Sequence, residues 1–326
     1  MPKYLKLNLD RHAEVFTNHK IVLIHNSKNL DYQNAKLRFY KYVPDKNWFN
    51  LEKLLGHSKD FRGNFWMTSC ARLFALKSYM ETSNEELIHT ESDVVLSEDF
   101  PFDDFSKINE PIAYPIISKV RGAGSIIYVR NLDAVNLLTS TILSEAASDS
   151  MTTEMIILRH LYQARKLSIR PLPIGPSTPD CYSFDVSSEL PRILEDQKVF
   201  DGCFDGVDIG QYFFGTDPRN RRGKYLIRKN IVNGYLKVER TRLEWNEERR
   251  FFDIYDKDLN SCAKLYSIHL AVKKINYFNK KKQLKYLQDW VKKQKLPGER
   301  FSLRIFVNSA LISVKRRVRL IVLINR

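Results

Sequence analysis

The stretch FWMTSCARLFALKSYMETSNEELIHTESDVVL, residues 65–96, decides the predicted fold and contains the first candidate site. In its first part, apolar side chains recur every seven residues, at Trp66, Leu73 and Met80, and this spacing predicts a helix with one apolar face. The segment ELIHT that follows, residues 86–90, is expected to be a short strand. A helix that leads into a strand favours an α/β fold.

Similar patterns continue on both sides of this stretch. The β-branched run KIVLIHN, residues 20–26, ends in polar residues, as a buried parallel strand does. Residues 175–225 are rich in Pro, Gly, Asp and aromatic residues, and we expect them to form a long loop region that covers a site. Further strands are expected at residues 111–120, 125–131 and 169–174, helices at 132–147, 151–166 and 282–295, and a hairpin arm at 237–245. This order predicts an α/β fold with a mostly parallel sheet flanked by helices.

The positive charge of the chain is concentrated near its C-terminus. Residues 264–326 contain 17 Lys and Arg side chains against two acidic ones, Asp289 and Glu299, which accounts for the whole net charge of +15. Residues 1–263 balance 36 basic against 36 acidic side chains. A basic segment of this kind attracts phosphates, either of a nucleic acid or of an anionic membrane. We therefore predict a near-neutral catalytic domain over residues 1–263 and a basic, helical extension over residues 264–326.

Two carboxylates, Glu91 and Asp93, follow the strand predicted at residues 86–90. In an extended segment, residues i and i+2 point to the same side, roughly 6–7 Å apart. Carboxylates placed in this way can share Mg²⁺ or Mn²⁺, ions that complete their shells with substrate phosphates. Two other interpretations stay open: an acid/base pair, or a solvated turn. Because ligands bind outside the carboxyl ends of strands in parallel sheets, His25 and Asn26 are expected near the same ligand.

The stretch at residues 65–96 also resembles the nucleotide-sugar-dependent glycosyltransferases of the GT-A fold, and the resemblance covers about residues 20–175. In that family a helix with a basic residue precedes a strand that ends in a DxD or ExD motif, which holds a divalent metal against the donor diphosphate. Arg72 matches the basic helix position, and Glu91 and Asp93 match the motif, with Glu in its first place. The resemblance implies Mn²⁺ or Mg²⁺ at the motif and Arg72 on the donor phosphates.

Four more positions follow from the same resemblance. Inverting enzymes of this type have a catalytic carboxylate beyond the motif, and Glu154 is the first candidate for this base, with Asp149 the second. Alternatively, Asp149 caps a helix and Glu154 complements its dipole. The family also often supplies a late His as a metal ligand and a nearby Lys on the diphosphate, which His269 and Lys273 match. A lone His among apolar residues is also commonly a core residue.

Two segments are candidate ligand loops. GAGSIIYVRN, residues 122–131, contains GxG but neither GxGxxG nor the GK[ST] of a P-loop, so it suits close approach of backbone to a sugar better than a dinucleotide. FDGVDIGQYFFGTDPRNRRG, residues 204–223, combines glycine, carboxylate, aromatic and arginine residues, a mixture suited to carbohydrate. The alternative for the second segment is an exposed loop, although three consecutive aromatic side chains are costly to expose. The candidate substrate-binding residues are Gly124, Asp205, Asp208 and Arg219.

The sequence predicts a cytoplasmic protein. The N-terminus has no apolar run of the signal-peptide type, and no stretch of about 18 uncharged apolar residues is present. The four cysteines form no CxxC pair, which disfavours a zinc knuckle and fits a reducing compartment. Residues 301–326 interleave aliphatic and basic side chains, and we expect them to contact the inner membrane face or to pack on the body. Within them RLIVLI, residues 319–324, could also be a buried strand.

Together these features predict a metal-dependent, inverting glycosyltransferase that transfers a sugar from a nucleotide-sugar donor to a glycan or lipid-linked acceptor, as in polysaccharide assembly. The metal and basic side chains would neutralise the charge that develops on the leaving diphosphate, and a base would accept the proton of the acceptor hydroxyl. A nucleic-acid-binding protein or metal-dependent nuclease is the competing prediction, which the neutral body disfavours. A non-catalytic protein of the same fold also stays open. A glycoside hydrolase is disfavoured, because both carboxylates would approach the sugar from one side.

Overall fold

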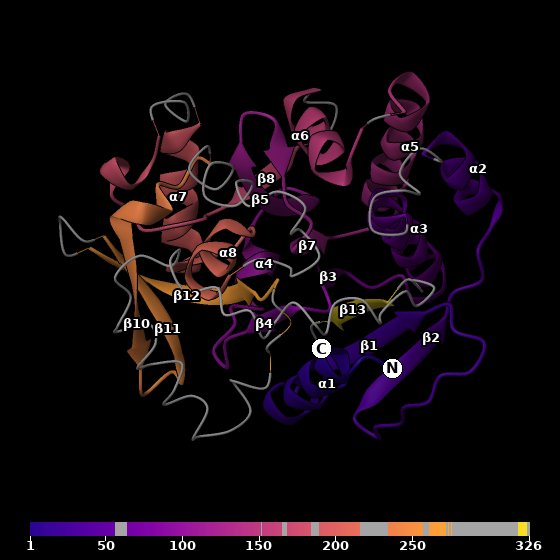
Figure 1. Ribbon diagram of the computed structural model, residues 1–326, viewed down its shortest axis with the longest axis horizontal. Helices are drawn as coiled ribbons and strands as arrows, with labels where there is room; N and C mark the ends of the chain where they lie inside the picture. Colours follow the sequence, from indigo (N-terminus) through magenta and orange to yellow (C-terminus); the bar gives the residue numbers. More distant parts are fainter. Residues whose placement is uncertain are drawn as a thin grey trace, which may run out of the picture.

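The computed structural model describes residues 1–55, 64–150, 152–164, 168–183, 189–215, 234–256, 261–271, 273, 275 and 319–324. These residues form two β-sheets with helices around them (Figure 1). The helices are α1 (Lys3–Val15), α2 (Lys46–Leu54), α3 (Phe65–Ser83), α4 (Asp104–Lys107), α5 (Leu132–Ser148), α6 (Glu154–Ala164), α7 (Leu190–Phe200) and α8 (Asp208–Phe214), with short 3₁₀ helices at Pro179–Cys181 and Val238–Arg240. The strands are β1 (Lys20–His25), β2 (Leu37–Lys41), β3 (Leu87–Thr90), β4 (Val94–Leu96), β5 (Ile112–Ser118), β6 (Arg121–Gly122), β7 (Ile126–Val129), β8 (Ile169–Leu172), β9 (Gly202–Phe204), β10 (Thr241–Asn246), β11 (Phe251–Asp256), β12 (Cys262–His269) and β13 (Arg319–Ile324).

The larger sheet is mixed, and most of its strand pairs are antiparallel. Its eight strands run in the order β2-β1-β13-β3-β7-β5-β6, and β8 pairs with β5. Only β1 with β2 and β5 with β8 are parallel within this sheet. The pairs of β1 with β13, β13 with β3, β3 with β7, β7 with β5 and β5 with β6 are antiparallel. The prediction of a mostly parallel, GT-A-like sheet is therefore wrong.

The error has a physical cause. Continuous apolar runs indicate that a strand is buried on both faces, which is typical of strands in parallel sheets. The central strands here are indeed covered on both faces, but burial does not fix strand direction. Between β5 and β7 the chain turns back through the short strand β6, which leaves no room for the long crossover that parallel neighbours require. In addition, β13 from the C-terminal region lies between β1 and β3 and runs opposite to both.

The smaller sheet has five strands, in the order β10-β11-β12-β4, with β9 beside β12. The hairpin predicted near residues 237–245 is confirmed, because β10 pairs antiparallel with β11. Strand β12 pairs antiparallel with β11 and β4 and parallel with β9. Since β3 belongs to the larger sheet and β4 to the smaller one, the chain crosses from one sheet to the other between residues 90 and 94.

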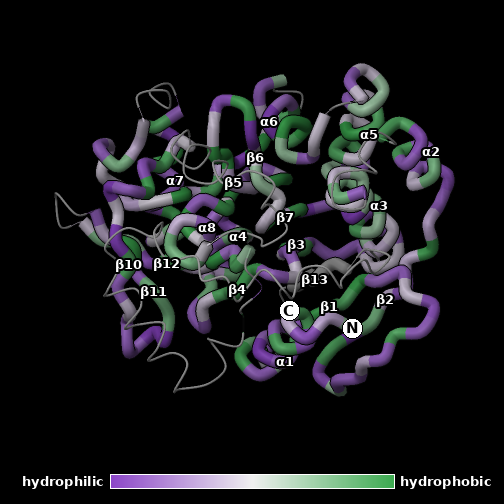
Figure 2. Tube along the Cα trace, viewed as in Figure 1, coloured by the Kyte–Doolittle hydropathy of each residue, from purple (hydrophilic) through white to green (hydrophobic). Residues whose placement is uncertain are grey.

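The larger sheet is covered on both faces. Along β1, Val22 and Ile24 pack into the core that contains the apolar side chains of α3 and α5, whereas Ile21 and Leu23 pack with Leu5 and Leu9 of α1. Figure 1 shows α3 and α5 on one side of this sheet and α1 on the other. Figure 2 shows hydrophobic segments gathered on the central strands and the helices over them. The sheet is thus the middle layer of the larger part of the fold.

Several further predictions can be compared with the structure. The helix predicted in the first part of the stretch at residues 65–96 is confirmed as α3. It has no single apolar face, because Ser69–Leu76 are buried without interruption over about two turns. The loop region predicted at residues 175–225 is wrong, since α7, β9 and α8 lie in it. RLIVLI is a strand, β13, and β12 also falls in the predicted C-terminal extension. The helix predicted at residues 282–295 lies outside the described residues.

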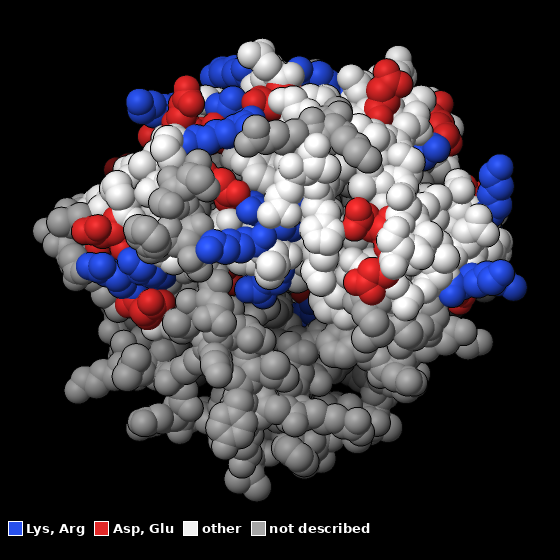
Figure 3. Space-filling view, turned by 90° about the horizontal axis from the view of Figure 1, so that it is seen from above, with Lys and Arg blue, Asp and Glu red and all other residues white. Residues whose placement is uncertain are grey.

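The described part of the surface carries charges of both signs (Figure 3). On the face shown in Figure 3, the described basic and acidic side chains are interspersed rather than separated into fields of one sign. Among the described residues, no helix combines the length and apolarity needed to cross a bilayer.

Candidate metal centre

The two carboxylates of the ExD motif lie in the crossing between the sheets. Glu91 directly follows β3, and Asp93 directly precedes β4. The turn is closed by the Val94 N–H, which donates to the Glu91 carbonyl at 3.0 Å. It is fastened on one side by the Glu91 N–H, which donates to the Ser125 carbonyl at 3.0 Å, and on the other by the Leu270 N–H, which donates to the Asp93 carbonyl at 2.8 Å. The pair therefore belongs to a fixed turn between two buried strands.

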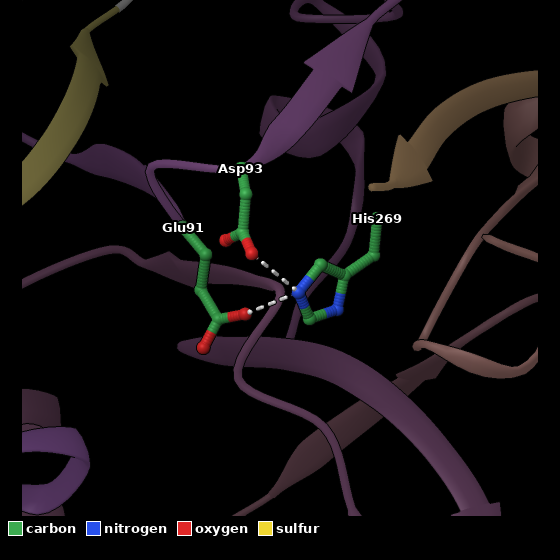
Figure 4. Close-up of side chains that lie close together, drawn as sticks. All are labelled: Glu91, Asp93 and His269. Carbon is green, nitrogen blue, oxygen red and sulfur yellow. Dashed lines mark ion pairs between the residues drawn. The ribbon is translucent and has the colours of Figure 1, made fainter. Parts of the chain in front are cut away.

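His269 joins the two carboxylates from the second sheet. It is the last residue of β12, and the antiparallel pairing of β12 with β4 sets it opposite Val94, next to Asp93. Its Nε2 lies 3.3 Å from a Glu91 carboxylate oxygen and 3.2 Å from an Asp93 oxygen. Figure 4 shows the imidazole pointing between the two carboxylates. One possible ligand atom from each of the three residues lies within 4.8 Å of the others, and we call these three residues the metal-ligand cluster.

Lys273 lies beside this cluster. Its ammonium forms an ion pair with Asp93, and its side chain is 27% exposed, so it is the most accessible of the charged groups here. The backbone at Lys273 is left-handed, with φ of 62°, a conformation that turns the chain sharply after β12. The Nζ atom lies 5.4 Å from the centre of the Tyr4 ring of α1, within reach of a cation–π contact.

Behind the cluster, Arg72 of α3 is buried between two carboxylates. Its guanidinium forms ion pairs with Glu91 and with Glu154 of α6, and its Nη2 donates to the Gly124 carbonyl at 3.3 Å. Glycine leaves room for this pair at position 124, because a Cβ there would lie 2.1 Å from a Glu154 carboxylate oxygen and 2.3 Å from Arg72 Nη2 and would displace these side-chain ends. The loop at Gly124 thus closes tightly over the ion pair of Arg72 and Glu154.

The two carboxyl groups on Arg72 differ in acidity. Burial is the largest single effect and would raise the pKa of Glu91, but the charges of Arg72 and His269 and the hydrogen bond from Arg72 together outweigh it, so the pKa is lowered. Burial dominates for Glu154, whose pKa is raised despite Arg72, and the negative charge of Glu91 raises it further. Two carboxylates share one guanidinium, and the one that belongs to the metal-ligand cluster keeps its charge. Glu91 is therefore the ionised member that a cation would meet.

Asp205 lies next to the metal-ligand cluster and binds the backbone of His269. It is fully buried, and one carboxylate oxygen accepts the Ile209 N–H at 3.1 Å, while the other accepts the N–H groups of Gly210 at 2.8 Å and His269 at 2.9 Å. Its backbone carbonyl accepts the Ser125 hydroxyl at 3.0 Å. Through these hydrogen bonds the Asp205 carboxylate connects the start of α8 to the end of β12, which is a structural role.

The remaining predicted residues are distributed as follows. His25 ends β1, and since β1 and β3 both run antiparallel to β13, it lies at the same edge of the sheet as Glu91. The His25 ring accepts the Ser27 N–H at 3.2 Å, and next to it the Asn26 side-chain oxygen is buried with no hydrogen-bond partner in the described part of the chain. Asp149 is exposed, lies outside the cluster and follows the C-terminal end of α5, instead of capping the start of the next helix. Arg219 lies outside the described residues.

Asp208 is a further buried carboxyl group near Asp205. It begins α8 and is 5% exposed, and burial raises its pKa to about 7 although Arg121 opposes the shift. One of its oxygens has no hydrogen-bond partner among the described residues. A carboxyl group in this condition titrates near neutral pH.

The donor set of the metal-ligand cluster fits a divalent ion. Carboxylate oxygens suit Mg²⁺ and Mn²⁺, whereas an imidazole nitrogen favours a transition metal over Mg²⁺. The His269 Nε2 already faces both carboxylates, so in the neutral tautomer that is protonated at Nδ1 the lone pair needed for a metal points into the cluster. Of the two ions predicted, this donor set favours Mn²⁺.

Comparison with known proteins adds no family to this description. No protein-family model, curated protein or solved structure matches the chain.

The sequence predicted the three cluster residues and the neighbouring Lys273, but not Asn8, which lies beside the turn that carries Asp93. Asn8 of α1 hydrogen-bonds to the carbonyl groups on both sides of Asp93. A signal was available: Asn8 lies among Leu5, Leu9 and Ala13 on the apolar face of a helix, where a polar residue needs a partner.

Proposed function

We propose that the chain is a metal-dependent glycosyltransferase that uses a nucleotide-sugar donor and a glycan or lipid-linked acceptor. The observation that supports this most is the convergence of Glu91, Asp93 and His269, from two different sheets, beside the ammonium of Lys273. The proposal rests on this site and not on the fold, since the expected parallel sheet is absent from the described residues.

Each residue of the site has a part in the proposal. A divalent ion held by the metal-ligand cluster would neutralise the charge that builds on the leaving diphosphate. Lys273 would add a second positive charge, because its side chain is long, partly exposed and already at the edge of the cluster. Arg72 is held by Glu91 and Glu154, so we assign it to fixing Glu91. Contact of Arg72 with the donor phosphates, which the resemblance implies, would require it to leave a buried carboxylate.

The nucleoside of the donor is proposed to lie near His25 and Asn26. These residues and Glu91 lie at one edge of the larger sheet, with β13 between their strands. Two interstrand spacings separate them, about 10 Å, which a nucleoside diphosphate can span. The buried, unpartnered side-chain oxygen of Asn26, noted above for the described residues, is available to accept a hydrogen bond from a base or ribose.

The acceptor base is proposed to be Glu154, with Asp208 as the second candidate. An efficient general base has a pKa near the working pH, and burial raises the pKa of both groups toward that range. The carboxylate of Glu154 lies against Arg72 under the Gly124 loop, so this role requires the loop to open before an acceptor hydroxyl comes within hydrogen-bond reach. Contact of the basic residues between 264 and 326 with an anionic membrane face, and hence action on a lipid-linked acceptor, belongs to the same proposal.

A thermal-unfolding experiment tests this function. The purified chain is heated with Mn²⁺ and with each of a panel of nucleoside diphosphates, alone and together, as wild type, Asp93→Asn and Asp104→Asn. Asp104 is a matched carboxylate, paired with Lys107 on α4 outside the site. A ligand at 100 times its dissociation constant adds about 2.7 kcal/mol to the free energy of unfolding. We expect one nucleotide to stabilise the wild type and Asp104→Asn only when Mn²⁺ is present, and to leave Asp93→Asn unchanged.

Two results would contradict the proposal. If a nucleotide stabilises the protein without metal, or stabilises Asp93→Asn as much as the wild type, the metal-ligand cluster does not take part in donor binding. Stabilisation by Mn²⁺ together with single-stranded nucleic acid, and by no nucleotide, would favour the metal-dependent nuclease instead.

A further inference from the structure

The N-terminal helix α1 reaches the turn that carries Asp93 through one side chain. Asn8 lies in the middle of α1 and is fully buried. Its Nδ2 donates to the Val94 carbonyl at 2.7 Å and to the Ser92 carbonyl at 3.3 Å. The residues that carry these two carbonyl groups flank Asp93, so a single amide group spans one of the three residues of the metal-ligand cluster.

The chemistry at this position is specific to an amide. The carbonyl oxygens of Ser92 and Val94, the residues before and after Asp93, are two hydrogen-bond acceptors. The NH₂ group of Asn8 has two N–H donors, one for each. The Asn8 oxygen is buried without a hydrogen-bond partner in the described part of the chain, so the donors alone account for the orientation of the side chain. An apolar residue of the same size would leave the two carbonyl groups without this donor.

The same helix also reaches the second cation of the site. Tyr4 lies one helical turn before Asn8, and its ring lies under the ammonium of Lys273. Through these two residues α1 touches both the carboxylate turn and the lysine that pairs with Asp93. The contacts of Ser125 and Leu270 fasten the other sides of the turn, and α1 supplies the remaining one.

We propose that Asn8 is a positioning residue of the metal centre: it fixes the turn at residues 92–94 and thereby sets the place of Asp93 opposite His269. The inference rests on the proposed function, since it assigns Asn8 to the metal site suggested there. Asn8 does not touch the metal-ligand cluster itself and acts through the backbone on both sides of Asp93. Residues that orient metal ligands in this way change metal affinity by about 10–100-fold when they are removed.

The test measures Mn²⁺ affinity directly, by calorimetry or by the electron paramagnetic resonance signal of free Mn²⁺, with no nucleotide present. The variants are Asn8→Ala, Asn8→Ser as a milder change should Asn8→Ala not fold, and Leu9→Ala as a control. Leu9 is the next residue of α1 and equally buried, but its side chain is apolar and donates no hydrogen bond to the turn. We expect Asn8→Ala to weaken Mn²⁺ binding at least tenfold, Asn8→Ser to weaken it less, and Leu9→Ala to destabilise the fold while changing Mn²⁺ affinity less than twofold.

The outcomes separate the two proposals. If the wild type binds Mn²⁺ but Asn8→Ala and Asn8→Ser bind it equally well, or if Leu9→Ala weakens it as much as they do, the positioning role is refuted and the proposed function stands. If the wild type does not bind Mn²⁺ at all, the proposed function and the role of Asn8 both fail.

Discussion

Replacing Arg72 with methionine should destabilise the protein far more than replacing either of its partners. Arg72 is buried and forms ion pairs with Glu91 and Glu154, which are themselves largely buried. Methionine keeps the length of the side chain and removes the charge. Two carboxylates would then share a buried site without a counter-ion on that side, and both the lost attraction and their mutual repulsion would act on the folded state.

The expected magnitude follows from the burial of the pair. Breaking a buried ion pair by removing one partner costs about 3–5 kcal/mol. For a chain of 326 residues, with an unfolding entropy of about 2.1 cal/mol/K per residue, this loss lowers the melting temperature by about 4–7 °C. Glu154→Gln should cost less than half as much, because Arg72 keeps Glu91 as its partner. In the Arg72→Met background, Glu154→Gln should stabilise, since it removes one of two uncompensated carboxylates.

The loss should also depend on pH, and the sign follows from Glu154. Its pKa is raised in the folded protein, and without Arg72 it rises further, so the folded protein prefers the protonated form. The stability that this group supplies is present at low pH and is lost as the pH rises through the folded pKa. Denaturant unfolding of Arg72→Met and wild type at pH 6 and pH 8.5 should therefore show the larger difference at pH 8.5. A cost no greater than that of Glu154→Gln, or one that is independent of pH, would refute the role of Arg72 as shared counter-ion.

Three further changes have predicted outcomes. Gly124→Ala should cost about 1–3 kcal/mol in urea unfolding, because its Cβ would lie 2.1 Å from a Glu154 oxygen; an unchanged midpoint would contradict the packing of this loop. Asp205→Asn should cost about 1–3 kcal/mol, since one acceptor of buried N–H groups becomes a donor, and it should weaken Mn²⁺ binding through His269; an intact Mn²⁺ affinity would show that Asp205 does not hold the histidine. Asp208→Asn should stabilise the protein at pH 8 and lose this advantage as the pH falls toward 4, because burial raises the pKa of Asp208 to about 7 and makes its charged form unfavourable in the folded state; equal stability gains at both pH values would contradict that cause.

The sequence was most informative where chemistry and local structure coincide. The strand at residues 86–90, the turn with Glu91 and Asp93 and the strand after it follow one another within a few residues, so their order could be predicted from the local pattern. The meeting of His269 with this turn was expected only through a resemblance to a family. In the structure it results from the pairing of β12 with β4, which no local pattern encodes.

The direction and order of the strands were not predictable in the same way. An apolar run shows that β1 is buried, but not that β13, about 300 residues further on, separates it from β3. Asn8 shows the opposite case. A polar residue on the apolar face of a helix is visible in the sequence, but the two carbonyl groups that it satisfies belong to a segment more than 80 residues away.

The most direct test of the central claim is an equilibrium titration of the metal-free protein with Mn²⁺, with the bound ions counted for wild type, Asp93→Asn and the matched control Asp104→Asn. If Glu91, Asp93 and His269 form a metal site, the wild type and Asp104→Asn should each bind one Mn²⁺ with the same affinity, and Asp93→Asn should lose that binding. Equal binding by all three proteins, or no binding by the wild type, would show that the three side chains form an ordinary ion-pair cluster, and the proposed transferase would lose its main support.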